Sequence, residues 1–189
     1  MKEKKLSNVF WTEALTGGLT IGVALFVWEL IGYWFDMPMK SSGLASFVVF
    51  VLLLGGIIFF CRRMRELRGP ALGFSYGEVF GFTMGMMLFT GIVCGIGTFF
   101  LKVVIAPEYF NEVLEASLWS SNLSEDMIEQ ALEMQQSSLM SNPAVHVVSG
   151  LLSMCVYGGL IGLIVAAFMK RPADPFAENN TPDDYNPQF

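Results

Sequence analysis

Three ionisable residues lie in or beside long apolar stretches of this 189-residue chain and are the first candidates for chemistry. Glu29 lies inside the first stretch, where an ionised carboxylate costs about 3 kcal/mol unless it is paired, protonated or in contact with water. His146 and Lys102 border later stretches and are candidate partners for it. One hypothesis is a proton or cation relay that uses Glu29. The favoured hypothesis is structural: Glu29 makes a polar bond between two helices or extends toward the interface.

Two other carboxylates have structural explanations. Glu13 precedes Glu29 by 16 residues, which is about 160° around a helix, so the two do not form a catalytic pair. We expect Glu13 to pair with the arginines that follow the second apolar stretch. Glu78 follows Ser75 by three residues, which is the spacing of a helix-capping box. Capping therefore explains Glu78 without a catalytic role.

Residue types that many other functions require are scarce. One histidine and three cysteines are too few for a structural zinc site or a Cys–His nucleophile, and Cys61, Cys94 and Cys155 are expected to be packing residues. No phosphate-binding loop, dinucleotide fingerprint or zinc-protease motif occurs. A net charge of −6 disfavours nucleic acid. We therefore expect no catalytic residue, cofactor, metal site or nucleic-acid partner, and not an enzyme.

The elements that must position these residues are four long apolar stretches in a chain that is 53% hydrophobic and only 15% charged. They cover about 9–35, 44–61, 79–101 and 145–169. A membrane helix needs roughly 20 mainly apolar residues, and backbone polar groups in lipid must be satisfied internally. The predicted fold class is all-α, with four transmembrane helices in a membrane domain over 1–171 and the lipid bilayer as its environment.

The distribution of positive charge predicts the orientation. Nine of the 11 Lys and Arg residues fall on one side of a four-span chain: Lys2, Lys4, Lys5, Arg62, Arg63, Arg65, Arg68, Lys170 and Arg171. Only Lys40 and Lys102 fall on the other side. Since Lys and Arg concentrate in cytoplasmic segments, we expect both termini in the cytoplasm and the protein in the bacterial inner membrane.

Two segments lie outside the predicted spans. The insert 103–144 carries seven acids and no Lys or Arg, and it is predicted to form two amphipathic helices, with Pro107 beginning the first and Ser124 capping the second. Asn142 is the predicted cap of the fourth span. The tail 172–189 has four prolines among polar and acidic residues and is predicted to be disordered and cytoplasmic.

Glycines recur at four-residue spacing in the spans, a pattern that lets helix backbones approach closely. The predicted packing positions are Gly77, Gly81, Gly85, Gly91, Gly95, Gly158 and Gly162, with Gly18 and Gly22 repeating the spacing in the first span. Packing within the chain is the simpler interpretation. Contact with a second copy or another protein, through these stripes or through the insert, is the alternative.

Four segments carry a resemblance to a known family: GFSYGEVF at 73–80, LSEDMIE at 123–129, SNP at 141–143 and KR at 170–171. Over roughly residues 10–171 the chain resembles the bacterial domain-of-unknown-function family numbered four-one-nine-nine. The resemblance implies a four-helix inner-membrane protein and brings no activity or catalytic residue with it. The predicted function is a non-enzymatic structural or interaction component of a membrane assembly; the alternative is a small proton- or cation-coupled transporter that uses Glu29.

Overall fold

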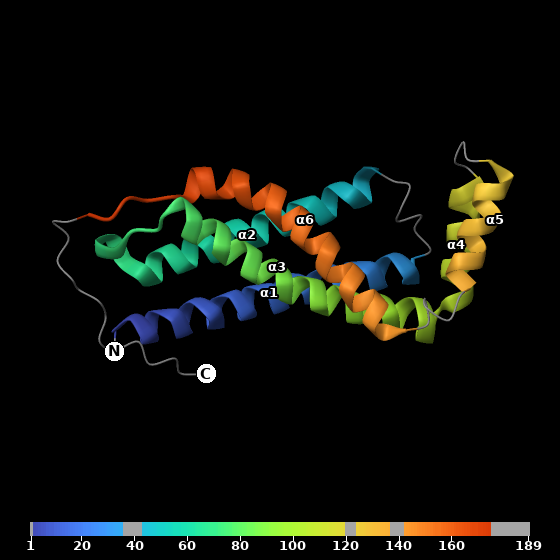
Figure 1. The fold of residues 1–189 in the computed structure, drawn as a ribbon, viewed down its shortest axis with the longest axis horizontal. Coiled ribbons are helices and arrows are strands. Elements are labelled where there is room, and N and C mark those ends of the chain that lie inside the picture. Colours follow the sequence, from blue (N-terminus) through green and yellow to red (C-terminus); the bar gives the residue numbers. More distant parts are fainter. Residues whose placement is uncertain (1, 36–42, 120–123, 137–141, 175–189) are drawn as a thin grey trace.

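The computed structural model describes residues 2–35, 43–119, 124–136 and 142–174, which form an elongated bundle of long helices with a short helical hairpin at one end (Figure 1). The helices are α1 (Lys2–Trp34), α2 (Gly43–Leu72), α3 (Tyr76–Phe99), the π-helical η1 (Phe100–Ile105), α4 (Pro107–Trp119), α5 (Glu125–Gln136) and α6 (Pro143–Met169). Within these ranges the β-structure is confined to one isolated antiparallel bridge between Phe74 and Arg171. The predicted all-α fold class is confirmed.

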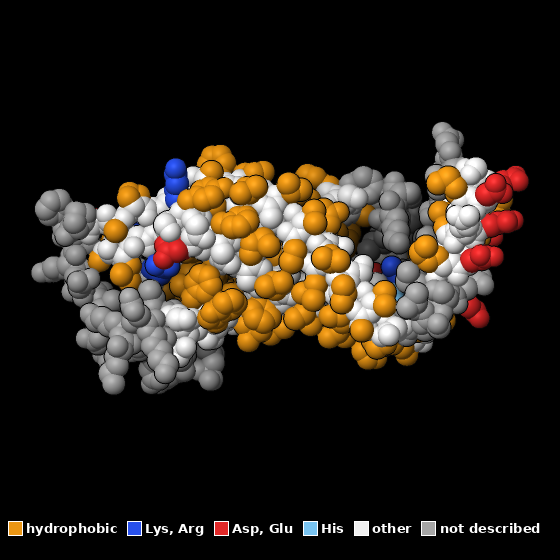
Figure 2. Space-filling view, viewed as in Figure 1, with side chains coloured by type: hydrophobic (Ala, Val, Ile, Leu, Met, Phe, Trp, Pro, Cys, Tyr) orange, Lys and Arg blue, Asp and Glu red, His pale blue; other side chains and the backbone are white. Residues whose placement is uncertain are grey.

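Four segments are long and apolar enough to cross a membrane: Ser7–Trp34, Ala45–Leu72, Tyr76–Ile105 and Pro143–Met169. The shortest has 27 residues and extends over about 40 Å, which exceeds the roughly 30 Å of a hydrocarbon core. Figure 2 shows hydrophobic side chains covering the middle of the bundle, while acidic side chains gather on the hairpin. Outward side chains on α6 such as Leu160 and Phe168 are 62% and 82% exposed, as expected of a surface that faces lipid.

The second and third helical segments continue beyond the predicted ends of their spans. The second was expected to end near residue 61, but α2 remains helical through the arginines as far as Gly69, whose backbone (φ 73°, ψ 173°) is non-helical, and Pro70 follows. The third continues beyond residue 101 as the wide turn η1, which closes with a 2.9 Å bond from the Ala106 amide to the Leu101 carbonyl. The arginine cluster therefore lies on a helix, and the insert begins after Ile105.

Helix α3 is the centre of the bundle and packs along α6 and α1. Small residues bring these backbones together. A Cβ atom on Gly18 of α1 would lie 2.5 Å from the Met86 carbonyl oxygen, and a Cβ atom on Gly95 would lie 2.6 Å from the His146 carbonyl oxygen. The tight approach places α1 and α6 on different faces of α3, because Met86 and Gly95 point in different directions around it.

The hairpin of α4 and α5 lies across one end of the bundle, which we call the hairpin end (Figure 1). The Tyr109 ring of α4 meets the Tyr33 ring of α1 edge-on at 5.3 Å, and Ile128 of α5 is buried. The connection between α4 and α5 at 120–123 falls outside the described residues, as does the tail from residue 175 onward.

Candidate functional site

The best-defined polar cluster lies at the opposite end of the bundle, which we call the Arg68 end. Helix α2 delivers Arg68 in its last regular turn, just before the interruption at Gly69. The chain then turns through Gly73, which has a positive φ of 64°, and enters α3 after Ser75. These two glycine conformations, which other residues adopt at a cost, return the chain so that the end of α2 faces the start of α3.

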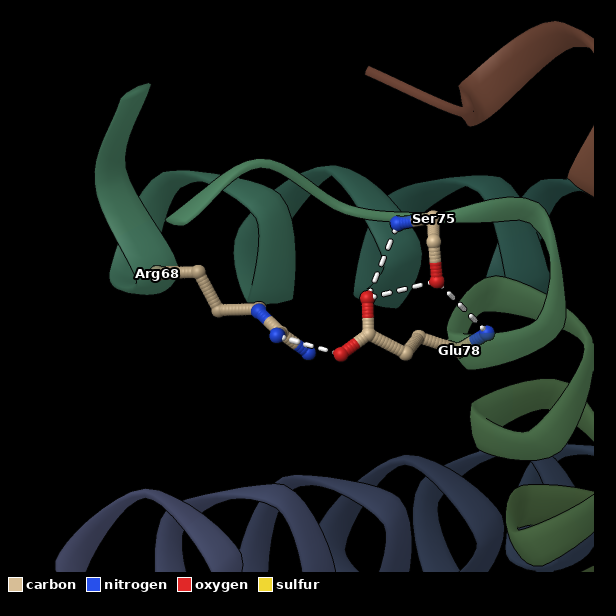
Figure 3. Close-up of polar contacts among 3 residues, drawn as sticks. All are labelled: Arg68, Ser75 and Glu78. Atoms are coloured by element: carbon tan, nitrogen blue, oxygen red, sulfur yellow. Dashed lines mark hydrogen bonds and ion pairs between the residues drawn. The ribbon is translucent and has the colours of Figure 1, made fainter. Parts of the chain in front are cut away.

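Glu78 binds both the end of α2 and the start of its own helix, as Figure 3 shows. Its Oε1 accepts a 2.5 Å charge-assisted hydrogen bond from Arg68 Nη2. Its Oε2 accepts from the Ser75 backbone amide at 2.9 Å and from the Ser75 hydroxyl at 2.7 Å. The Glu78 amide in turn donates to Ser75 Oγ at 3.4 Å, which completes the capping box expected from the sequence.

Arg68 is held in an unusually dry position for a guanidinium group. Its side chain is only 9% exposed, and its Cζ lies 5.3 Å from the centre of the Phe74 ring, which is fully buried. The Arg68 Nε atom is buried and has no hydrogen-bond partner among the described residues. The ring face and the Glu78 carboxylate together offset the loss of water around this charge.

A short strap after α6 closes over the same turn. The Phe74 and Arg171 backbones exchange two 2.8 Å hydrogen bonds, and the Asp174 amide donates to the Pro70 carbonyl at 3.0 Å. The approach is so close that a Cβ atom on Gly73 would lie 2.6 Å from the Ala173 nitrogen. Residues 170–174, called the strap from here on, therefore tie the end of α6 to the α2–α3 turn.

A second ion pair joins α1 to α2 at this end. The Arg63 Nη2 atom donates to Glu13 Oε1 at 3.0 Å, and Arg63 Nε lies 3.0 Å from Glu13 Oε2 without hydrogen-bond alignment. The Glu13 side chain is 7% exposed, whereas that of Arg63 is 42% exposed. This is the pairing with the arginine cluster that the sequence predicted for Glu13.

The chemistry of the Arg68 end is that of a structural junction. Both Glu78 carboxylate oxygens accept hydrogen bonds from Arg68 or Ser75, and the side chain is 40% exposed. Within the ranges that the structure describes, no group of three or more His, Cys, Asp or Glu side chains is arranged to hold a metal ion. The cluster fastens α1, α2, α3 and the strap to one another.

The three ionisable candidates from the sequence lie at the other end of the bundle. The Glu29 carboxylate interacts electrostatically with the Cys94 thiol of α3, and the His146 ring packs 5.8 Å from the Phe99 ring. Lys102 lies in η1, one turn beyond Phe99. All three side chains are partly buried, and each makes at least one polar, electrostatic or ring contact. The fold therefore brings them to neighbouring levels of the bundle from α1, η1 and α6.

Two further cap positions were predicted. The Asn142 side chain accepts a 2.9 Å bond from the Ala144 amide at the start of α6. Helix α5 begins directly after Ser124, whose backbone carbonyl accepts from the Met127 and Ile128 amides. The positions of both helix starts agree with the sequence prediction.

The predicted glycine stripe divides into packed and open positions. Packing contacts are present at Gly85, Gly91, Gly95, Gly158 and Gly162. Gly77 and Gly81 do not pack on any residue that the structure describes: both are exposed, and a Cβ atom on either would meet nothing within 4 Å. The expectation of internal packing is wrong for these two, because the stripe winds off the α3 face that α1 and α6 cover.

Several contacts were missed by sequence reasoning. The Arg68–Glu78 pair joins residues that are only ten apart, and the turn signals Gly69, Pro70 and Gly73 between them were available to predict a reversal. Gly150 is a second case, because a Cβ atom there would lie 2.6 Å from the Gly91 carbonyl oxygen. No other glycine lies four residues before or after it, so the four-residue spacing did not identify it.

A comparison with family models places residues 16–171, more than four-fifths of the chain, under the description "Protein of unknown function (DUF4199)". The match confirms the resemblance inferred from the four sequence segments. No curated protein and no solved structure matches the chain.

Proposed function

The chain belongs to the DUF4199 family of proteins of unknown function, and from this premise we propose that it is a non-enzymatic, multi-pass component of a bacterial inner-membrane assembly. In this proposal the Arg68 end and both termini lie in the cytoplasm, because nine of the 11 Lys and Arg residues gather on that side. The hairpin of α4 and α5 then lies outside the membrane, where it is available to a partner.

The surface of the hairpin is the observation that carries the proposal. Its seven carboxylates are all exposed: Glu108, Glu112, Glu115, Glu125, Asp126, Glu129 and Glu133. Part of its apolar side packs inward, with Ile128 buried and Tyr109 packed on Tyr33, while Trp119, Met127 and Met134 are more than half exposed (Figure 2 shows the acidic face). Helices that bind lipid surfaces are usually basic, whereas a partner protein with Lys and Arg would relieve the repulsion among these carboxylates.

The Arg68 end supports a structural rather than a catalytic role. Its charged groups form two ion pairs between helices, Glu13 with Arg63 and Glu78 with Arg68, in which Glu13 and Arg68 are the buried members. A catalytic carboxylate needs a partner poised for proton transfer, whereas each carboxylate at this junction pairs with an arginine of a neighbouring helix.

Site-specific photocrosslinking in cells tests the proposal. A photoreactive amino acid at exposed Glu112 or Glu129 should yield a defined protein adduct, either a partner or a second copy. The same amino acid at lipid-facing Leu160 should not. Replacing the neighbouring hairpin acids by amides should abolish the hairpin adduct. A chain that stays a clean monomer at every hairpin position contradicts the proposal.

A fusion experiment tests the orientation separately. A reporter that is active only outside the cytoplasm should be inactive when fused behind Phe189 and active when inserted between α4 and α5. The reverse result overturns the orientation.

A second candidate function is a small proton- or cation-coupled transporter. The observation that favours it is that Glu29, Lys102 and His146, from three elements, lie at neighbouring levels toward the hairpin end of the bundle. Intramembrane ionisable residues often mark ion pathways. Flux into proteoliposomes should then fall in Glu29→Gln and persist in Glu13→Gln, which removes a carboxylate from the Arg68 end instead. An unchanged rate in Glu29→Gln removes this candidate.

A further inference from the structure

The four arginines of α2 divide into two pairs by whether they form an ion pair. Arg63 and Arg68 pair with Glu13 and Glu78 on neighbouring helices. Arg62 is exposed and Arg65 is half-buried, and neither forms an ion pair with any residue that the structure describes. The first two arginines therefore join helices at the Arg68 end, whereas Arg62 and Arg65 have no such role.

Arg62 and Arg65 follow the lipid-facing surface of α2. Phe59 is 60% exposed and lies three residues before Arg62, which puts the two on the same side of the helix. Cys61 and Met64, on the inward side, are fully buried. With Phe59 in hydrocarbon, Arg62 and Arg65 lie one and two turns closer to water, at the depth of the lipid headgroups.

We propose that Arg62 and Arg65 form a binding site for the headgroup of an anionic phospholipid. Two guanidinium groups three residues apart on one helix can both donate to phosphate oxygens, and no carboxylate that the structure describes forms an ion pair with either of them. Glu66 lies on the same side of α2 as Arg62. It is about 6 Å from Arg62 along the helix axis, in the direction of the water. The proposal requires that the four helices cross a bilayer and is independent of their orientation and of the hairpin's partner.

Native mass spectrometry of the full chain in an uncharged detergent tests this site. Phosphatidylglycerol and phosphatidylcholine with identical acyl chains are the two probes. The wild-type chain should retain phosphatidylglycerol preferentially. Arg62→Gln with Arg65→Gln should weaken phosphatidylglycerol binding about thirtyfold, and each single variant about fivefold. The matched control is Lys170→Gln with Arg171→Gln, which removes the same charge from exposed positions after α6 and should change binding less than about threefold.

Three outcomes would overturn the proposal. Equal losses in the two double variants would mean that net charge alone attracts the lipid. Equal retention of phosphatidylcholine would remove the requirement for an anionic headgroup, and full competition by soluble glycerol phosphate would show that the site takes a free phosphate. If the Arg62 and Arg65 double variant does not fold, the two single variants test the site instead: each should bind phosphatidylglycerol about fivefold more weakly than the wild-type chain, and unchanged binding in both would overturn the proposal.

Discussion

The Thr90 hydroxyl oxygen lies 3.1 Å from the Gly18 carbonyl oxygen of α1 and 3.0 Å from the Met86 carbonyl oxygen of its own helix. A threonine hydroxyl has one proton, so this bond is shared between the two helices. It forms where the α1 and α3 backbones are closest, since a Cβ atom on Gly18 would lie 2.5 Å from the Met86 oxygen and 2.6 Å from the Phe89 Cβ. The absence of a side chain at residue 18 allows the threonine to reach across.

Gly18→Ala should therefore destabilise the protein. The added methyl group meets backbone that cannot move without separating α1 from α3, and overpacking of this kind typically costs about 1–3 kcal/mol. Gly81→Ala is the matched control, because its Cβ would meet nothing within 4 Å. It should be neutral or stabilising by up to about 1 kcal/mol, since alanine favours a helix over glycine. Unfolding in mixed micelles with increasing SDS measures both; equal destabilisation would contradict the packing described here.

Thr90→Val should cost about 1 kcal/mol of unfolding free energy, because the α1–α3 hydrogen bond is lost while the shape of the side chain is kept. Thr16→Val is the control. The Thr16 hydroxyl donates to the Thr12 carbonyl one turn earlier in the same helix and is exposed at the bundle surface. Its replacement should change stability by less than about 0.5 kcal/mol. If Thr90→Val and Thr16→Val change the free energy of unfolding equally, the interhelical hydrogen bond contributes nothing to stability.

The sequence predicts the number, type and approximate limits of the helices because apolar length and capping are local properties. Ser75, Glu78 and Asn142 mark helix starts without reference to the rest of the chain. The end of α2 was placed too early, since the loss of apolar character after Cys61 was taken as the end of the helix. The arginine-rich segment continues as a helix, and two of its arginines pair with carboxylates on other helices, which apolar length does not reveal.

The site was less predictable because its contacts depend on tertiary structure. Glu78 has a complete local explanation as a cap, so the capping pattern alone does not predict its ion pair with Arg68, and only the turn signals between the two residues indicate it. The bridge from Arg171 to Phe74 joins positions almost a hundred residues apart. For the same reason, four-residue spacing detected the glycines of α3 but not which of them face another helix, and Gly77 and Gly81 do not.

The Glu13–Arg63 pair should respond asymmetrically to substitution. Arg63→Gln leaves the nearly buried Glu13 without its counter-charge and should cost about 2–3 kcal/mol. Glu13→Gln leaves Arg63, which is 42% exposed and remains hydrated, and should cost about 1 kcal/mol or less. The double variant should resemble Glu13→Gln alone, because the buried charge is gone. SDS-induced unfolding of all four proteins measures the cycle, and equal costs for the two single variants would contradict the burial difference.

Gly73→Ala should detach the strap from the α2–α3 turn. The φ of 64° disfavours a side chain by about 1 kcal/mol, and a Cβ atom would lie 2.6 Å from the Ala173 nitrogen, which belongs to backbone and not to a flexible side chain. The Arg171 and Asp174 amides donate two of the three hydrogen bonds between the strap and the turn, so they should lose protection from hydrogen exchange in the variant while amides in the middle of α6 keep theirs. Gly77→Ala, four residues along in open space, should leave all of these rates unchanged. Arg171 and Asp174 amides that stay protected in Gly73→Ala would show that the turn accommodates a methyl group and that the strap does not depend on glycine.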